Sequence, residues 1–112
     1  MAASPAHRRY WVYILASKPS GTLYIGVTNS LKRRIWEHKT GAIAGFTKQY
    51  SVKTLVYLES HRNVTDAIQR EKTLKGWLRA RKVDLIRQEN PLWQDLAADW
   101  YQLPMDSSLR SE

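Results

Sequence analysis

One carboxylate, Glu71, has an unusual sequence environment. It lies four residues after Ala67 and three before Leu74, within an apolar helical pattern, and it is the only acid between residues 70 and 82, where six residues are basic. Glutamate is rarely buried without a partner. A carboxylate on an inward helix face in a basic region could hold a divalent metal ion beside a phosphate. A salt bridge to a neighbouring Lys or Arg, or a partly exposed position at the edge of the stripe, accounts for the same pattern.

Arg34 and His38 form a second pair of groups that could act on a phosphate. They are four residues apart, so on a helix they share a face with the apolar Leu31 and Ile35. An inward arginine offers a planar fork for phosphate oxygens, and a nearby histidine can pass a proton near neutral pH. The alternative is structural: Arg34 extends to solvent along its aliphatic stem, and His38 is a hydrogen-bonded core residue.

These candidate residues depend on the elements that position them. Three segments rich in aromatic and β-branched residues are predicted as strands: 10–15, 23–27 and 54–58. Three segments are predicted as helices: one capped by Asn29 or Ser30 and ended by Gly41, one from the Asn63/Asp66 cap to about residue 78, and one over 79–89. Residues 40–53 are expected to form a loop. In the second strand, the period of two places Tyr24 and Gly26 on one face and Ile25 on the other.

Length and composition limit the class of protein. The chain has 112 residues, of which 43% are apolar and 25% charged, so one folded domain is expected. The chain has no cysteine, which excludes disulfides, thiolate metal sites and a cysteine nucleophile. The longest apolar stretch, seven residues from position 10 to 16, is far below the ~20 needed to span a membrane. No signal peptide is visible, so we expect no membrane association and a cytoplasmic location.

Positive charge is concentrated in the first three-quarters of the chain. Residues 1–82 include sixteen basic and four acidic residues, a net charge of +12, whereas residues 83–112 include two basic and six acidic residues. Such a field attracts phosphate backbones and favours a nucleic-acid partner. General solubility, or attraction to acidic membranes or proteins, would produce the same excess.

Several of these residues match a known pattern. Trp11-Val12-Tyr13 and Tyr24-Ile25-Gly26 resemble the two halves of the GIY-YIG nuclease signature, with Trp11 in place of the leading glycine. Arg34 stands eight residues after Gly26, where that family has its catalytic arginine, and Glu71 resembles its metal-binding glutamate. The resemblance extends over residues 10 to 96. Over this range, the chain is similar to the small stand-alone bacterial members of the family, which are related to the nuclease module of the excision-repair endonuclease.

The resemblance implies a fold and an activity. The expected fold is an α/β (α+β) unit with a three-stranded antiparallel sheet flanked by helices. The expected activity is metal-dependent hydrolysis of DNA, structure-selective or weakly specific, in repair or processing; the sequence does not separate DNA from RNA. The implied domain covers residues 10–96, between a flexible tail at 1–9 and an acidic tail at 97–112.

The resemblance also implies residue roles. One Mg²⁺ or Mn²⁺ would bind Glu71, and Arg34 would hold the phosphate. Tyr13 would act as general base with its pKa lowered by the metal and arginine, or His38 would take or relay the proton, and Tyr24 would position water. Gly26 would leave space at the strand for helix and substrate. Asn90 resembles a family asparagine near the site.

The remaining expectations concern nucleic-acid contacts. Eight basic residues are predicted to contact the phosphate backbone: Lys32, Arg33, Lys39, Lys72, Lys75, Arg79, Arg81 and Lys82. Trp36 and Trp77 could stack on bases, although packing is the simpler expectation. The alternatives to a nuclease are a non-catalytic nucleic-acid-binding protein that retains the fold and a basic subunit of a repair complex. Intact Tyr13, Tyr24, Arg34 and Glu71 argue against a non-catalytic binder.

Overall fold

The computed structural model describes residues 9–101, so most of the two expected tails, at 1–9 and 97–112, lies outside the described residues. The described part contains three strands: β1 (Tyr10–Ala16), β2 (Leu23–Thr28) and β3 (Thr54–His61). It also contains four helices: α1 (Leu31–Thr40), α2 (Phe46–Gln49), α3 (Val64–Gly76) and α4 (Arg79–Glu89). The predicted strands and the three predicted helices are confirmed, with ends that differ by no more than about three residues.

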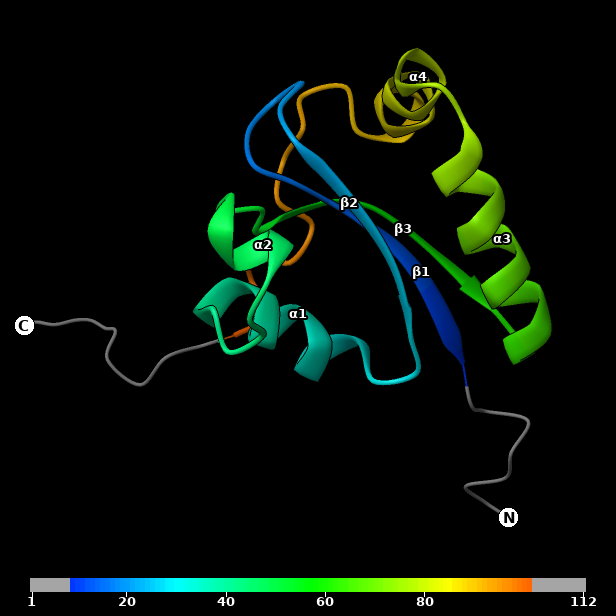
Figure 1. The fold of residues 1–112 in the computed structure, drawn as a ribbon, viewed down its shortest axis with the longest axis horizontal. Coiled ribbons are helices and arrows are strands. Elements are labelled where there is room, and N and C mark those ends of the chain that lie inside the picture. The colour runs from blue at the N-terminus through cyan, green and yellow to red at the C-terminus, as the bar shows by residue number, and fades with distance from the viewer. Residues whose placement is uncertain (1–8, 102–112) are drawn as a thin grey trace, which may run out of the picture.

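The strands form one antiparallel sheet in the order β2-β1-β3, with β1 in the centre (Figure 1). This confirms the expected three-stranded antiparallel sheet. In the register of β1 and β2, Tyr13 lies opposite Gly26, and Leu15 lies opposite Tyr24. Residues directly opposite each other share a face. The register therefore brings both signature tyrosines to the same face of the sheet.

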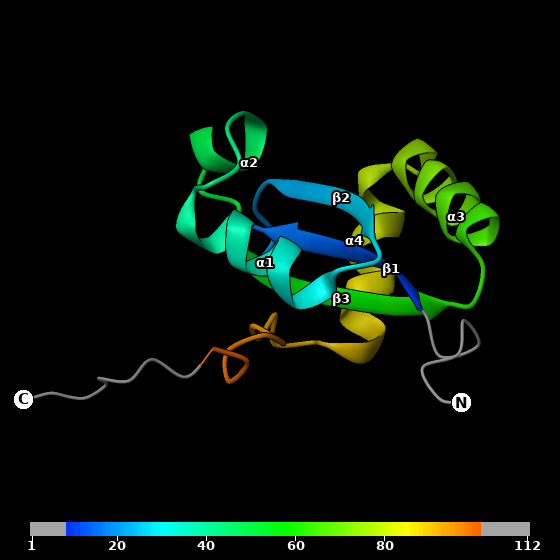
Figure 2. The same ribbon diagram turned by 90° about the horizontal axis from the view of Figure 1, so that it is seen from below.

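Helices cover both faces of the sheet. Figure 2 shows α1 on one side of the strands and α4 on the other. Alternate residues of β1 divide between the two layers: Val12 and Ile14 pack in a cluster with α3 and α4, and Tyr13 and Leu15 pack in a cluster with Ile35 of α1. The Tyr13 face is thus the α1 face.

Local signals explain the helix ends. Gly41 ends α1 in the left-handed conformation, with φ of 76°, and its N–H and the N–H of Ala42 bond to the carbonyls of His38 and Glu37. At α3, the side chain of Asn63 accepts a hydrogen bond from the N–H of Asp66. These short-range interactions are readable from sequence because both partners are close along the chain.

A carboxylate network fixes α3 to the sheet. Glu59 on β3 accepts hydrogen bonds from the Tyr57 hydroxyl at 2.6 Å and from Nε of Arg70 at 3.0 Å, and its other contact is Nε2 of His61 at 2.7 Å. Burial acts to raise the pKa of Glu59, but these hydrogen bonds outweigh it and lower the pKa below its usual range. Since Arg70 is engaged by Glu59, it does not neutralise the adjacent Glu71.

Two features differ from the sequence prediction. The predicted loop at 40–53 contains α2, which buries Thr47. The apolar stripe of α3 is only partly buried: Ala67 and Leu74 lie in the core, whereas Val64 and Ile68 are exposed, as is Leu78 beyond the helix. The helix α3 contacts all three strands of this small sheet, and part of its apolar face still meets solvent.

The chain after α4 returns to the α1 face. Ala97 is buried there, Trp100 and Tyr101 pack against the same cluster, and the Tyr101 hydroxyl donates to the carbonyl of Lys32 at 2.6 Å. Residues 97–101, predicted from the sequence as part of the acidic tail, therefore pack against the core through Ala97, Trp100 and Tyr101. Within residues 9–101, no helix is long and apolar enough to cross a bilayer.

Candidate active site

Three predicted site residues from three elements meet on the α1 face. Tyr13 comes from β1, Tyr24 from β2 and His38 from α1. The ring centroids of Tyr24 and His38 lie 5.3 Å apart, those of Tyr13 and His38 5.7 Å, and those of the two tyrosines 6.3 Å. Helical spacing places His38 on the inward face of α1, and strand alternation places Tyr24 on the same side of the sheet as Tyr13. The three rings therefore form an aromatic cluster.

The cluster contains a buried chain of hydrogen bonds. Oη of Tyr13 lies 2.9 Å from Nε2 of His38, and Nδ1 of His38 lies 3.0 Å from Oγ1 of Thr47. The three residues are only 2%, 2% and 3% exposed. Sequence analysis did not identify Thr47, because one threonine in a polar segment has no local pattern. Only the tertiary contact with His38 marks it.

The electrostatic environment decides the protonation of this chain. Burial raises the pKa of Tyr13 well above its usual value, Tyr24 adds to the rise, and the Arg34 guanidinium offsets only part of it. From the sequence, Arg34 is expected to help lower the pKa of Tyr13 so that Tyr13 can act as a general base. Within the chain, burial outweighs Arg34 and the pKa is raised instead. Burial and Arg34 lower the pKa of His38, so its imidazole is neutral at pH 7 and has one ring nitrogen free to accept a proton.

The Tyr13 ring lies directly over Gly26. A Cβ atom built on Gly26 would stand 2.4 Å from Oη and 2.5 Å from Cζ of Tyr13. The space that the sequence prediction reserved at Gly26 for helix and substrate is thus occupied by the ring of its cross-strand neighbour. Glycine at this position allows the tyrosine to reach His38.

Arg34 has a buried atom that lacks a partner. Among the described residues, its Nε is the one buried side-chain polar atom with no hydrogen bond. The closest carboxylate oxygen, on Glu37, lies 3.7 Å away, which is beyond hydrogen-bond distance. Arg34 lines a cavity of about 260 Å³ together with residues from β1, β2, the turn after β2, and α3: Tyr10, Val27, Thr28, Asn29, Val64 and Ile68. The guanidinium is therefore positioned to bind a group that enters this cavity.

Glu71 approaches the site from α3. No hydrogen bond joins it to Tyr13, Tyr24, Arg34 or His38 within residues 9–101, but its charge is near enough to raise the pKa of Tyr13. Its carboxylate is 15% exposed and pairs with Nζ of Lys75 at 2.9 Å, while Lys75 is 52% exposed. The salt bridge considered as an alternative is therefore present in the described structure.

The predicted metal role of Glu71 would rest on a single carboxylate. In the described part of the chain, no three His, Cys, Asp or Glu residues gather as a metal cage. Mg²⁺ often binds proteins through one or two carboxylates and keeps several waters. Glu71 offers one such carboxylate, and its pair with the half-exposed Lys75 would have to open for an ion to bind there.

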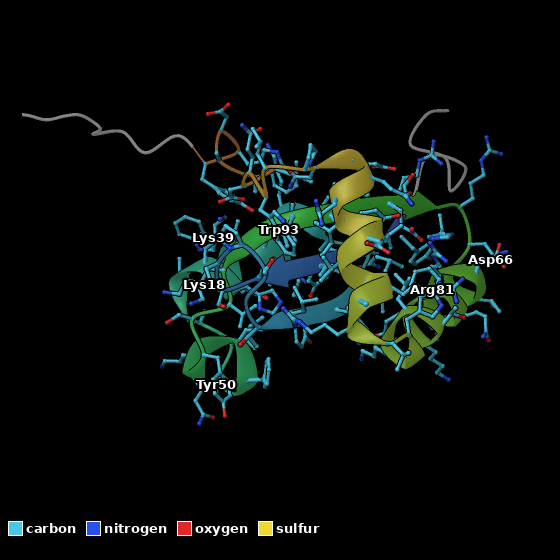
Figure 3. The ribbon with its side chains drawn as sticks, turned by 90° about the horizontal axis from the view of Figure 1, so that it is seen from above. Lys18, Lys39, Tyr50, Asp66, Arg81 and Trp93 are labelled. Carbon is cyan, nitrogen blue, oxygen red and sulfur yellow. The ribbon has the colours of Figure 1, made fainter. Side chains whose placement is uncertain are left out.

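The eight predicted backbone-contacting cations fall into two groups. Three are engaged within the protein: Lys39 pairs with Asp95, Arg79 donates to the carbonyls of Ser20 and Gly21, and Arg81 lies 4.0 Å from the centre of the Trp77 ring. Figure 3 shows Lys39 and Arg81 at separate ends of the molecule. The remaining five lie on the surface or at its edge: Lys32, Arg33, Lys72, Lys75 and Lys82. Two of these five also have a carboxylate on their own helix, Glu71 at 2.9 Å for Lys75 and Glu37 at 3.9 Å for Arg33.

Asn90 has a structural position. Its amide N–H groups donate to the carbonyls of Val56 at 3.1 Å and Gln94 at 2.9 Å, and its side-chain oxygen accepts from the N–H of Gln94. These bonds fasten the segment after α4 to β3. The contacts involve none of the candidate catalytic residues, near which the resemblance placed Asn90.

Comparison with known proteins agrees with this arrangement. The family model described as the GIY-YIG catalytic domain matches residues 9–84. The chain is 35% identical over 80 residues to a UPF0213 protein of Natronomonas pharaonis, covering 71% of this chain and 93% of that protein. It is 38% identical over 82 residues to a UPF0213 protein of Syntrophus aciditrophicus, covering 72% and 92%.

A solved structure supports the same assignment. The solution structure of a UPF0213 protein from Bacillus halodurans is similar to this fold with a TM-score of 0.50 and 25% identity, covering 81% of this chain and 97% of that one. The matched segment contains Tyr13, Tyr24, Arg34, His38 and Glu71. The chain therefore belongs to the GIY-YIG family, a family of nucleases.

Proposed function

We propose that this protein is a divalent-metal-dependent endonuclease that hydrolyses phosphodiester bonds in DNA. The observation that carries the proposal is the buried Nε of Arg34, which has no hydrogen-bond partner and lies on a residue that lines a cavity. The Arg34 charge is also near enough to act to lower the pKa values of both Tyr13 and His38. A buried donor without a partner is costly in a stable fold and points to a missing ligand. A phosphate oxygen supplies the acceptor that a guanidinium fits best.

The buried chain supplies the route for the proton. Water that attacks phosphorus loses a proton to Oη of Tyr13 as the Tyr13 hydroxyl passes its own proton to Nε2 of His38. One O–H bond of water and the original O–H bond of tyrosine break, and new O–H and N–H bonds form. Tyr13 never carries a full charge, which matches its raised pKa. His38 is neutral beforehand and therefore able to accept.

The other residues hold the reacting groups. Arg34 binds the non-bridging phosphate oxygens, where negative charge grows in the transition state. Tyr24, next to both rings, orients the attacking water. Glu71 would hold one Mg²⁺ or Mn²⁺, and that ion would supply charge stabilisation for the leaving oxygen. The exposed cations position the strand without reading its sequence, so weak sequence specificity is expected.

The test compares two adjacent arginines. Purified wild type, Arg34→Ala and Arg33→Ala are assayed for cleavage of labelled duplex, single-stranded, flap, branched and RNA substrates with Mg²⁺, Mn²⁺ or chelator. Arg33 is exposed and its Nε lies 3.9 Å from Glu37, so it is the matched control. Arg34→Ala is expected to lower the cleavage rate about 100- to 1,000-fold, and Arg33→Ala only a few-fold.

The outcomes separate a nuclease from a binder. Equal losses in the two variants would make Arg34 an ordinary backbone contact. Binding of DNA without cleavage under any metal condition would favour the non-catalytic alternative.

A further inference from the structure

A second cavity lies at the first half of β2, whereas the Arg34 cavity lies at the end of this strand. The second cavity has a volume of about 240 Å³ and is lined by residues of β2, α2, α3 and α4: Leu23, Tyr24, Ile25, Phe46, Lys75 and Lys82. The Arg34 cavity instead adjoins Val27 and Asn29 near the end of the same strand. On α3, Ile68 lines the first cavity and Lys75 the second, with Glu71 between them. The two cavities therefore lie on either side of the candidate metal ligand.

The second cavity has an aromatic wall that the fold does not require. Phe46 is 46% exposed and its ring stacks with Tyr24 at 6.4 Å between centroids and 29° between planes. Tyr50, 50% exposed, lies 4.9 Å from Phe46. Figure 3 shows Tyr50 at the end of the molecule formed by α2. Exposed, adjoining aromatic rings offer a flat apolar surface to a flat ligand.

Two cations also line the cavity. They are Lys82 from α4 and Lys75 from α3, whose Nζ pairs with Glu71 at 2.9 Å. An aromatic surface beside two ammonium groups is complementary to a nucleotide, which has a flat base and a negative phosphate. The volume lies below the range of about 300–1,000 Å³ typical of drug-sized ligands, which suits a single base.

We propose that this cavity binds an unpaired nucleobase of the substrate strand, on one side of the cleaved bond. This inference rests on the proposed nuclease function and adds the substrate class. A base that enters this cavity and stacks on Phe46 cannot at the same time stay stacked between its neighbours in a duplex. The protein therefore acts where the strand is unpaired or readily opened next to the reacting phosphate.

The tryptophans considered from sequence are less suited to this task. Trp77 is covered by the guanidinium groups of Arg81 at 4.0 Å and Arg70 at 5.4 Å from its ring centre. Trp36 packs against Tyr101, with 5.4 Å between ring centroids. Phe46 is the residue whose ring is exposed, adjoins Tyr24 and lines a cavity.

The experiment separates base binding from phosphate binding. Binding is measured in chelator, which prevents metal-dependent cleavage, with two probes: oligothymidylate of about 12 nucleotides and an abasic phosphodiester oligomer of equal length and charge. Wild type is expected to bind oligothymidylate about 5- to 100-fold more tightly, as one or more base-stacking contacts would give. Phe46→Ala should lose most of this preference while keeping its affinity for the abasic oligomer, and Phe46→Trp should retain it.

Controls make each outcome decisive. Leu92→Ala removes another exposed apolar side chain, on the loop after α4, and should keep the wild-type preference. Thermal unfolding of each variant verifies the fold. Equal binding of both probes by wild type, or an undiminished preference in Phe46→Ala, would overturn the base site. Cleavage is scored separately on wild type, so a protein that cleaves DNA without base preference refutes this inference alone, and one that prefers bases but never cleaves refutes the nuclease.

Discussion

Replacing Thr47 by valine tests whether the buried chain organises the site. Valine has nearly the shape of threonine but no hydroxyl, so Nδ1 of His38 loses the group that lies 3.0 Å from it. Both residues are buried, so water cannot readily take the place of the hydroxyl. The imidazole then keeps one satisfied nitrogen, Nε2 against Tyr13, and one that is not satisfied.

The magnitude follows from burial of the orphaned nitrogen. An unsatisfied buried polar group costs about 1–3 kcal/mol. For a domain of this size, a loss of about 2 kcal/mol lowers Tm by about 8–16 °C. Thr47→Ser retains the hydroxyl and loses only a methyl group, so its Tm should fall by less.

The effect on catalysis is larger than stability alone explains. The proton transfer requires the tautomer in which Nδ1–H donates to Oγ1 of Thr47 and Nε2 accepts the Tyr13 proton, and Thr47→Val removes the acceptor that this tautomer needs. Without Thr47 the imidazole can adopt the other tautomer or rotate away. We expect kcat for cleavage to fall about 10- to 100-fold in Thr47→Val with KM little changed, as for loss of an outer group that orients a working histidine.

Two measurements check this reasoning. Nitrogen NMR of the histidine ring reports the tautomer in wild type, Thr47→Val and Thr47→Ser, independently of activity. Steady-state cleavage gives kcat and KM for the same proteins at a temperature below every Tm. A Thr47→Val protein with wild-type tautomer and kcat would refute the positioning role of Thr47, even if its Tm fell.

Three further predictions concern the same site. Gly26→Ala should lower kcat strongly and Tm by several degrees, because the new Cβ would stand 2.4 Å from Oη of Tyr13 and must displace it; unchanged activity and Tm would contradict the close packing. Glu71→Gln should abolish metal-dependent cleavage and change the free energy of unfolding by less than about 1 kcal/mol, because its partner Lys75 is half exposed; a variant that still cleaves would exclude Glu71 as the metal ligand. Because burial and Arg34 lower the pKa of His38, the proton acceptor stays neutral in acid, and kcat/KM should begin to fall only below about pH 6.5; an acid limb at higher pH would exclude His38 as the acceptor.

Short-range patterns made the elements predictable. The Asn63 cap, the Gly41 stop and the alternation at Tyr24 each depend on residues close in sequence, and each is confirmed. The segment around α2 was not predictable in the same way. Its four-residue helix is held by tertiary contacts, above all the bond from Thr47 to His38, which lie nine residues apart.

Charge was the least specific guide. In the sequence, Lys39 and Arg79 are basic residues in a basic region, as Lys72 is. In the structure, Lys39 pairs with Asp95 and Arg79 donates to the carbonyls of Ser20 and Gly21, all distant in sequence. A basic side chain becomes a structural contact or a ligand contact according to what the fold places opposite it. Sequence spacing along one helix does not contain that information.

Adjacent Arg33 and Arg34 illustrate what the sequence does contain. Successive helical residues point about 100° apart, so spacing alone turns Arg34 toward the apolar Ile35 side and leaves Arg33 in solvent. What spacing cannot reveal is that Nε of Arg34 is buried without a hydrogen-bond acceptor, although 40% of the side chain is exposed. A fold optimised only for stability would pair this nitrogen or replace it, since local rules are broken mainly at functional sites. The unpaired donor and the neutral imidazole beside it are therefore best explained together, as two halves of a site completed by a phosphate.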